Sequence, residues 1–309
     1  MRPALKSGLL PVWRDQDTVQ IGIDPRRAIA LSGMSQAAGL IGLLDGSRDR
    51  EQVIAAAARR GIPVPAAERI LTLLAAGGAL DDFPAGMLRE LPAAQRAKLA
   101  AELATAALAH GEGDGGARVI ARRRAALVRI EGDRRIGRAI ARILSSAGVG
   151  LVCSAQPPGG RPASAIRPDL VILIGHQPTG MPDELVRERI PHLAVSAGEA
   201  IGVVGPLVIP GATACLRCID YFRAGNDPAW PLILAQLSGR RPEPPACDAV
   251  LAASVAAQAA AQALTAIDKA AASCAAVNGT LELVLPGWQW RRRTWPPHPA
   301  CTCAGHTTA

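Results

Sequence analysis

The sequence is poor in aromatic residues, in lysine and in long apolar runs. Aromatic residues make up only 3% of the 309 residues, and Lys6, Lys98 and Lys269 are the only lysines, so arginine carries most of the net charge of +8. No run of about 18 uninterrupted apolar residues occurs, and the first residues have too short an apolar core for a signal peptide. We therefore expect a cytoplasmic protein that does not enter a membrane. The positive charge permits an acidic partner but does not identify one.

Four of the seven cysteines form two close pairs, Cys215 with Cys218 and Cys301 with Cys303. An odd number of cysteines fits reduced thiols and a metal better than a disulfide framework. A C-x-x-C turn and a C-x-C turn can each aim two thiolates at one point, and together they can complete a tetrahedral site for Zn²⁺. Such a site is closed to substrate. We expect a structural zinc ion that ties the end of the chain to its middle.

The remaining cysteines and one histidine carry weaker signals. Cys247 begins a predicted helix whose dipole could lower the thiol pKa and produce a nucleophile, although a buried helix cap explains its place in PPACDAV equally well. Cys153 and Cys274 are expected to be small buried residues. His298 precedes the second cysteine pair, and it is either an alternative ligand or a group beside the ligands.

Residues 1–83 are predicted to form a small unit of short strands and three helices. Asp49 suits a helix N-cap and Pro65 a first helical turn, whereas Gly61 and Gly77 suit helix ends. The expected strands cover 11–13, 18–23, 28–31 and 79–82, and the expected helices cover 35–44, 49–60 and 65–76. This order predicts a winged-helix-like α/β module.

Winged helices often bind DNA, so the third predicted helix was examined for groups that read bases. It offers only Glu68, Arg69 and Thr72 among apolar residues, and the module carries ten basic against nine acidic residues. Readout of DNA needs more donors and more positive charge than this. An apolar helix beside a short strand favours a peptide that adds a strand to the sheet. A winged-helix DNA-binding regulator is kept as an alternative, but no nucleic-acid partner is expected.

The order strand–strand–strand–helix–LDGSRDREQV–helix–helix resembles the PqqD-like precursor-peptide recognition domain of proteins that modify ribosomally made peptides. The resemblance implies that a leader peptide pairs with the third strand and lies against the third helix. It makes candidates for leader-peptide binding of Ala28, Ile29, Ala30, Leu31 and Ser32 on the strand, and of Ile70, Leu73 and Leu74 on the helix. The alternative for the helix positions is that they are core residues.

Residues 84–116 are predicted as a connection, with a helix at 91–109 and a flexible glycine-rich linker at 110–116. Residues 117–309 then alternate between strand and helix patterns, which predicts a largely parallel sheet with crossover helices. The expected strands cover 125–130, 149–153, 169–174, 193–196 and 200–208, the helices cover 135–147, 182–189 and 246–272, and a hairpin covers 280–285 and 288–293.

The first strand–turn–helix of this α/β region is where a nucleotide would bind. A dinucleotide fingerprint has three glycines, but here Gly132 and Gly137 flank Arg134 at the middle position. The second strand runs into 155–156 without the carboxylate that holds a ribose. The turn is therefore a degenerate nucleotide loop, although Arg134 and Arg135 could still hold an anion. Nine arginines against two acids over 118–142 predict either a solvated helix face or a docking face for an acidic peptide or partner protein.

The stretches LVRIEGDRRIGRAIARILSSAGVG, DLVILIG and CLRC resemble the ThiF/E1-like adenylating superfamily, which implies a Rossmann-type domain with a zinc site. Active members carry an Asp after the later strand, where this chain has His176 and Gln177. The stretches GPLVIPG, CLRCID, DPAWP and WPPHPACTC resemble more narrowly the ocin-ThiF-type proteins of thiazole/oxazole-modified microcin clusters, the C or F protein of the cyclodehydratase.

That resemblance implies a role in the biosynthesis of bacteriocin-type peptides. It implies a protein that binds the leader and presents the core peptide to a separate YcaO-type protein, which uses ATP to form azolines from Cys, Ser or Thr. We expect a subunit that has no catalytic residues, binds no ATP and does not turn over substrate by itself. A homodimer is compatible with this role. An ATP-dependent E1-like adenylyltransferase acting on a peptide or carrier protein is the first alternative.

Overall fold

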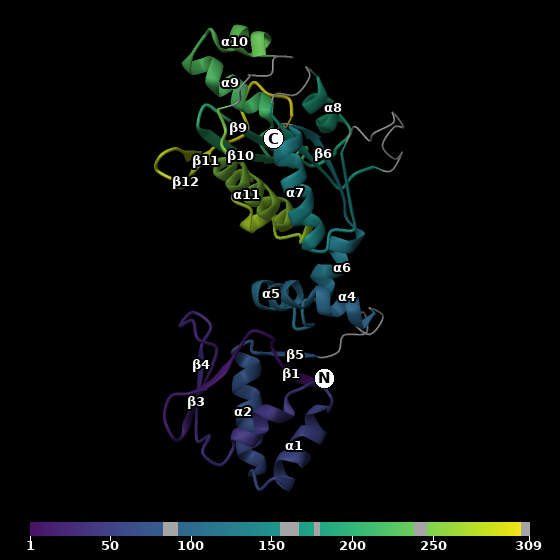
Figure 1. The fold of residues 1–309 in the computed structure, drawn as a ribbon, viewed down its shortest axis with the longest axis vertical. Coiled ribbons are helices and arrows are strands. Elements are labelled where there is room, and N and C mark those ends of the chain that lie inside the picture. Colours follow the sequence, from purple (N-terminus) through teal and green to yellow (C-terminus); the bar gives the residue numbers. More distant parts are fainter. Residues whose placement is uncertain (83–91, 155–166, 176–179, 238–245, 304–309) are drawn as a thin grey trace. The chain divides into compact units, whose positions relative to one another are not determined.

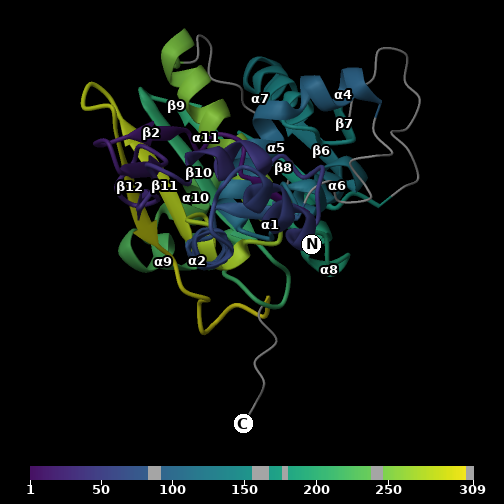
Figure 2. The same cartoon turned by 90° about the horizontal axis from the view of Figure 1, so that it is seen from below.

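The structure is a computed structural model that describes residues 1–82, 92–154, 167–175, 180–237 and 246–303. The chain divides into two compact units, residues 1–121 and residues 122–309, and each has its own hydrophobic core. The elements of both units are labelled in Figure 1 and are seen from below in Figure 2.

The first unit contains two small sheets and a set of short helices. Strands β2, β3 and β4 form an antiparallel sheet in that order, and β1 pairs with β5. The strands are β1 (Pro3–Leu5), β2 (Pro11–Trp13), β3 (Thr18–Ile21), β4 (Ile29–Ser32) and β5 (Leu80–Asp82), and the helices are η1 (Ala38–Leu43), α1 (Arg50–Arg59), α2 (Val64–Ala76), α4 (Ala93–Lys98) and α5 (Ala100–His110). The sequence did not predict β1, which is only three residues long.

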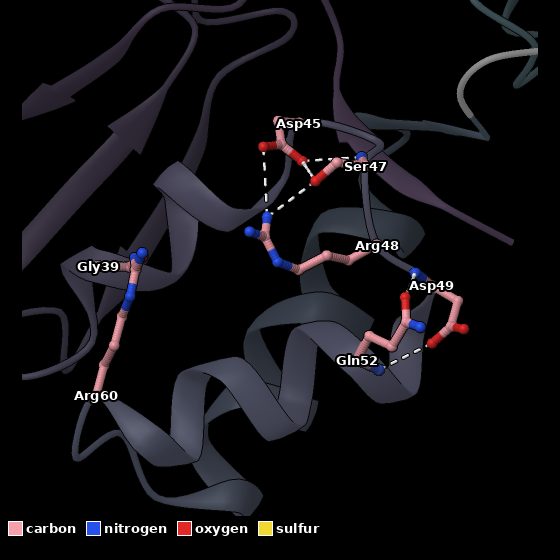
Figure 3. Close-up of polar contacts among 7 residues, drawn as sticks. All are labelled: Gly39, Asp45, Ser47, Arg48, Asp49, Gln52 and Arg60. Carbon is pink, nitrogen blue, oxygen red and sulfur yellow. Dashed lines mark hydrogen bonds and ion pairs between the residues drawn. The ribbon is translucent and has the colours of Figure 1, made fainter.

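The three helices expected in this unit differ in how well their ends are fixed. The segment predicted as a helix over 35–44 is a 3₁₀ helix over 38–43 without a side-chain cap, and it contains Gly39 and Gly42. In α1, by contrast, the Asp49 carboxylate accepts from the backbone N–H of Gln52, and the Gln52 side chain accepts from the N–H of Asp49 (Figure 3). This reciprocal capping is worth about 1 kcal/mol and fixes the helix start.

Arginine side chains fasten α1 to the segment before it. Arg48 reaches Asp45 at 3.4 Å and Ser47 Oγ at 2.9 Å, and Arg60 donates to the carbonyl of Gly39 at 3.1 Å (Figure 3). Arg60 therefore links the end of α1 to the 3₁₀ turn, whereas the Arg48 contacts lie within the loop that precedes α1.

The segment predicted as a flexible connection belongs to the first unit. The expected single helix is interrupted at Leu99 and forms α4 and α5. Buried Lys6 donates from Nζ to the carbonyl of Ala107 at 2.8 Å and lies 3.8 Å from Asp81, whose pKa is raised by burial. The predicted linker is also held, because Asp82 donates its N–H to the carbonyl of Gly113 at 2.8 Å. The glycines of 110–116 supply turns with positive φ, and the flexibility expected of this linker stays a prediction.

The second unit is built on a seven-stranded sheet in the order β12-β11-β10-β9-β8-β6-β7. Helix α6 (Ala117–Ala125) crosses the boundary between the units and leads into the first strand of this sheet. The strands are β6 (Leu127–Gly132), β7 (Leu151–Ser154), β8 (Leu170–Ile174), β9 (His192–Gly198), β10 (Ile201–Val208), β11 (Gly279–Val284) and β12 (Gln289–Thr294), and the helices are α7 (Arg134–Ser146), α8 (Met181–Arg187), α9 (Leu216–Asn226), α10 (Trp230–Leu237), α11 (Ala249–Ile267) and η2 (Ala271–Ser273).

The sheet is mixed, so the expectation of a largely parallel sheet was wrong for its second half. Strands β7, β6, β8 and β9 are parallel, whereas β9 to β12 are antiparallel. The change follows from a two-residue turn between β9 and β10, in which Glu199 and Ala200 both have positive φ. Such a turn places β10 beside β9 in the antiparallel direction, and no crossover helix lies between the two strands. The sequence did not predict this turn, because neither of its two residues is a glycine.

Helices α7 and α11 lie side by side on one face of the sheet (Figure 1). Arg135 donates to the carbonyl of Cys247 at 2.9 Å near the two N-termini. At the other end, buried Arg123 contacts both helices: it donates to Asp268 at 2.9 and 2.7 Å and to the carbonyl of Ala147 at 3.2 Å. The two helices are therefore a parallel pair that is fastened at both ends.

Helix α11 is long and apolar enough to cross a membrane by length and composition, with a mean hydropathy of 1.6. A core helix of a soluble protein passes the same test, and Leu251, Val255 and Ala259 of α11 are fully buried against the sheet. The finding is therefore weak support for a membrane span.

Candidate functional sites

The four paired cysteines meet in one cluster, as the sequence predicted. Cys215 is the N-cap of α9 and Cys218 lies in its first turn, whereas Cys301 and Cys303 lie in the segment after β12. The Sγ–Sγ distances are 3.8 Å for 215–218, 3.6 Å for 215–301 and 3.3 Å for 218–303, and all four sulfurs lie within 4.8 Å of one another. A tetrahedral zinc ion with Zn–S bonds of about 2.3 Å needs sulfurs roughly 3.8 Å apart. The cluster therefore fits a structural zinc ion.

Burial sets the electrostatics of the cluster. It raises the pKa of the Cys215 thiol strongly and that of Cys301 to about 11. At these two positions the neutral thiol is favoured without a cation. Burial alone would also raise the pKa of Cys303, but side-chain hydrogen bonds with Cys215, Cys218 and Cys301 outweigh it and lower that pKa. A bound metal requires thiolates and releases their protons. Cys215, Cys218 and Cys301 pack with Val208 at the end of β10. A metal here would join the end of the chain to the sheet, which is the role expected from the spacing.

His298 orients the second cysteine pair. Its ring stacks on Tyr221 with centroids 5.1 Å apart and meets the edge of Phe222 at 4.6 Å. Its Nδ1 accepts the N–H of Ala300 at 3.1 Å, so this nitrogen is already used. Among the described residues, the ligand set consists of the four cysteines, and His298 holds the segment that leads to Cys301.

The remaining cysteines show no activated thiol. Burial raises the pKa of Cys247, and the nearby Arg135 guanidinium offsets only part of this effect. The interpretation of Cys247 as an activated nucleophile is therefore wrong. Cys274 is buried as expected, and its Sγ lies 3.1 Å from Gln262 Oε1, whereas Cys153 is only half-buried.

The degenerate nucleotide loop is closed by its own side chains. Gly132 has φ +105°, and the Asp133 carboxylate accepts the N–H groups of Arg135 and Ile136 at 2.8 and 2.9 Å. A phosphate at this helix start would need those same N–H groups and would meet the carboxylate's negative charge. Gly137 serves packing, because a Cβ there would lie 3.2 Å from Ile130 Cγ2. These residues do not fit ATP. Residues 155–156 and 176–177, which bore on this prediction, lie outside the described residues.

The candidate peptide-binding strand β4 is an open edge. The backbone N–H of Arg14 donates to the carbonyl of Thr18, and that of Gly22 donates to the carbonyl of Leu10. The even-numbered residues of β3 therefore form the hydrogen bonds with β2. The odd-numbered residues of β3 therefore bond to β4, where they meet Ile29 and Leu31. It follows that the backbone N–H and C=O groups of Ala30 and Ser32 point away from β3. No strand covers them within the described residues.

Helix α2 runs along this open strand. A Cβ on Gly77 would strike Ile29 near one end of β4, and a Cβ on Gly33 would lie 3.2 Å from Arg69 Nη2 at the other end. Leu73 lies midway between Arg69 and Gly77 on the same line of the helix, and 47% of its surface is exposed. The edge therefore has an exposed apolar side chain beside free backbone groups.

The other predicted helix positions are part of the core. Ile70 and Leu74 are 1% and 0% exposed, so a ligand reaches neither without displacing the core. On the strand, Leu31 is likewise buried, and Ala28 donates its N–H to Asp24 within a turn. Sequence reasoning missed Arg69, although its i, i+4 spacing from Leu73 placed it on the same line.

The opposite edge of this sheet, β2, is built differently. It exposes apolar side chains, and Trp13 is 54% exposed. Its outward backbone positions are Pro11 and Trp13, and proline has no N–H to donate. Proline at an edge blocks strand addition, so β4 is the edge of this sheet that can accept a strand.

Solved structures of MccB and of heterocyclases share this fold. E. coli MccB, solved with AMPCPP and MccA, matches with a TM-score of 0.67 at 14% identity over 99% of this chain and 100% of that chain. The heterocyclase TruD matches with a TM-score of 0.70 at 18% identity, and a heterocyclase in complex with substrate and cofactor with 0.70 at 17%. Each heterocyclase match covers 98% of this chain but only 43% and 39% of the heterocyclase. The sequence matches no protein-family model and no curated protein. The chain has the α/β fold that MccB and part of each heterocyclase share.

Proposed function

We propose that the chain binds the leader region of a ribosomal precursor peptide and presents its core to a separate, ATP-using YcaO-type protein that forms azolines. The observation that carries the proposal is the open β4 edge beside exposed Leu73, together with the proline-blocked β2 edge. Of the two edges of the three-stranded sheet, only β4 offers two successive outward residues that each have both an N–H and a C=O group.

The backbone of β4 would supply affinity and α2 would supply specificity. A leader strand would exchange hydrogen bonds with Ala30 and Ser32, and alternate leader side chains would point towards α2. There an apolar side chain would meet Leu73, and Arg69 would attract an acidic one. This PqqD-like, winged-helix-like recognition mode needs no DNA contact.

The fold relatives support a role in peptide modification. MccB is described as the microcin C7 biosynthetic enzyme in complex with N-formylated MccA, and a heterocyclase has been solved with its substrate. The present chain spans less than half of each heterocyclase. The proposal assigns the heterocycle-forming chemistry to a second protein, and holding the peptide near that protein raises its effective concentration.

An ATP-dependent, E1-like adenylyltransferase is the second candidate, because MccB has been solved with ATP and matches along its whole length. The Asp133 carboxylate at the start of α7 weighs against it. Peptide-dependent exchange of pyrophosphate into ATP by the chain alone would establish this candidate in place of the first.

The proposal is tested by titrating the full-length chain with a labelled leader peptide from a short Cys/Ser/Thr-rich precursor, sought among the neighbouring genes. Leu73→Glu should weaken binding by about tenfold or more, because it places a charge beside the bound strand. Ala75→Glu is the matched control on the exposed surface of the same helix and should change affinity less than about twofold. Equal effects of the two variants, or no leader binding by the wild type, would refute leader recognition at this edge.

A further inference from the structure

The outer face of α7 is a stripe of arginines. Ile136, Ile140 and Leu144 of this helix are buried against the sheet. At 100° per residue, the opposite arc holds only arginine and serine. Its exposed members are Arg134, Arg135, Arg138, Arg142, Ser145 and Ser146.

The stripe has no acidic counterpart on its own helix, and α7 contains no Asp or Glu. Some exposed arginines elsewhere pair with carboxylates, for example Arg26 with Asp24 at 2.7 Å and Arg217 with Asp183 at 2.7 Å. Arg138 and Arg142 make no hydrogen bond or ion pair with any described residue. Like charges four residues apart destabilise a helix. The stripe therefore opposes the stability of α7, which points to a ligand outside the chain.

The neighbouring helix adds a flat apolar strip. Val250, Ala253, Ala257 and Ala261 are exposed on α11 and lie on one side of it, away from the buried residues. Since α11 and α7 are parallel and fastened at both ends by Arg135 and Arg123, the strip and the stripe run in the same direction on one rigid surface. Alanines let another backbone approach closely, and the arginines flank it.

We infer that this helix-pair face, the α7 stripe with the α11 strip, docks an acidic amphipathic helix of a partner protein. The small side chains of the incoming helix would pack on the alanines, and carboxylates at its flank would reach Arg138 and Arg142. Carboxylates every fourth residue on such a helix are about 6 Å apart, which is the spacing of these arginines. The inference concerns the second unit and does not depend on leader binding at β4.

Other occupants fit this face less well. A second copy would place arginines opposite arginines. A membrane-surface helix needs large apolar side chains such as Trp, Phe or Leu, and the strip has only Ala253, Ala257, Ala261 and one valine. A nucleic acid would be attracted to the arginines but would gain nothing from the alanines.

The test uses the full-length chain and a fluorescein-labelled synthetic helix of about 20 residues, with Ala and Leu on one face and Glu along one flank. Arg138→Glu with Arg142→Glu should weaken binding by about tenfold or more. Arg50→Glu with Arg59→Glu, two exposed arginines of α1, makes the same change in net charge and should weaken it by less than about twofold.

A third variant separates docking from general charge attraction. Ala257→Arg adds a positive charge but obstructs the strip, so docking predicts weaker binding of the acidic helix. Tighter or unchanged binding by Ala257→Arg would overturn the inference. It would also be overturned if duplex DNA or phosphatidylserine vesicles bound the wild type and lost binding through the same arginine pair, while the acidic helix did not bind.

Discussion

The two units treat their hydrogen-bonding groups in opposite ways. In the first unit, the N–H and C=O groups of Ala30 and Ser32 are left open at a sheet edge. In the second unit, two other candidate ligand sites are occupied by the chain itself: the Asp133 carboxylate caps the start of α7, and four cysteines face one another. The difference supports the proposal that peptide recognition belongs to the first unit, because the start of α7 in the second unit is already capped by the chain's own side chain.

The comparison is tested most severely at the cysteine cluster. If the cluster holds a structural zinc ion, wild-type protein should contain about one zinc per chain by elemental analysis. Cys301→Ser should lose that metal and several kcal/mol of stability, because metal binding is coupled to folding. Cys153→Ser, outside the cluster, should retain the metal. A well-folded wild type without metal, or an unchanged melting temperature of Cys301→Ser, would contradict the assignment.

The link between α7 and α11 in the second unit is tested at its buried ion pair. Arg123→Ala leaves Asp268 buried without its partner and should cost about 3–5 kcal/mol in the free energy of unfolding measured by urea titration. The double variant Arg123→Leu with Asp268→Leu removes both charges and should be much less destabilised. Equal losses in the single and double variants would show that packing, and not the ion pair, fastens α7 to α11.

Strand addition at the open edge of the first unit is tested on β4 itself. Ala30→Pro removes an outward N–H but leaves the inward N–H groups of Ile29 and Leu31, so the sheet should remain folded. Leader affinity should fall by about tenfold, or roughly 1.4 kcal/mol, in a fluorescence titration. Trp13→Ala on β2 is the control and should leave affinity within about twofold. A larger loss with Trp13→Ala would place recognition on the opposite edge.

The smallest expected effect concerns the cap of α7. Asp133→Ala should destabilise the protein by about 1 kcal/mol and free two N–H groups for an anion. Added sulfate should then raise the melting temperature of this variant more than that of the wild type. The variant Asp133→Ser keeps a neutral cap and should respond in between. Identical responses of all three proteins would mean that the carboxylate does not exclude anions.

Patterns within short segments predicted much of this structure. The run LVILI predicted β8, the order of strand, glycine turn and helix predicted α7, and the spacing of the cysteine pairs predicted the cluster. These features depend on local periodicity or on residue types with one dominant use. The burial of Ile70 and Leu74 was also readable, because they share a helical face with Ala67 and Leu71.

Features that depend on distant partners were not predictable. The alanine-rich sequence of α5 does not indicate that Lys6 donates to the carbonyl of Ala107, so the helix was predicted to be part of a connection. The three-residue strand β1 exists only through its pairing with β5. The open state of β4 required the pairing register of three strands, which sequence alone does not set.

The central claim is that a leader peptide adds a strand to β4, and amide hydrogen exchange tests it directly. On saturation of the full-length chain with leader peptide, the outward N–H groups of Ala30 and Ser32 should exchange much more slowly, and that of Trp13 on β2 should not change. Protection at Trp13 with none at Ala30 and Ser32, or no protection at either edge despite binding, would contradict the claim.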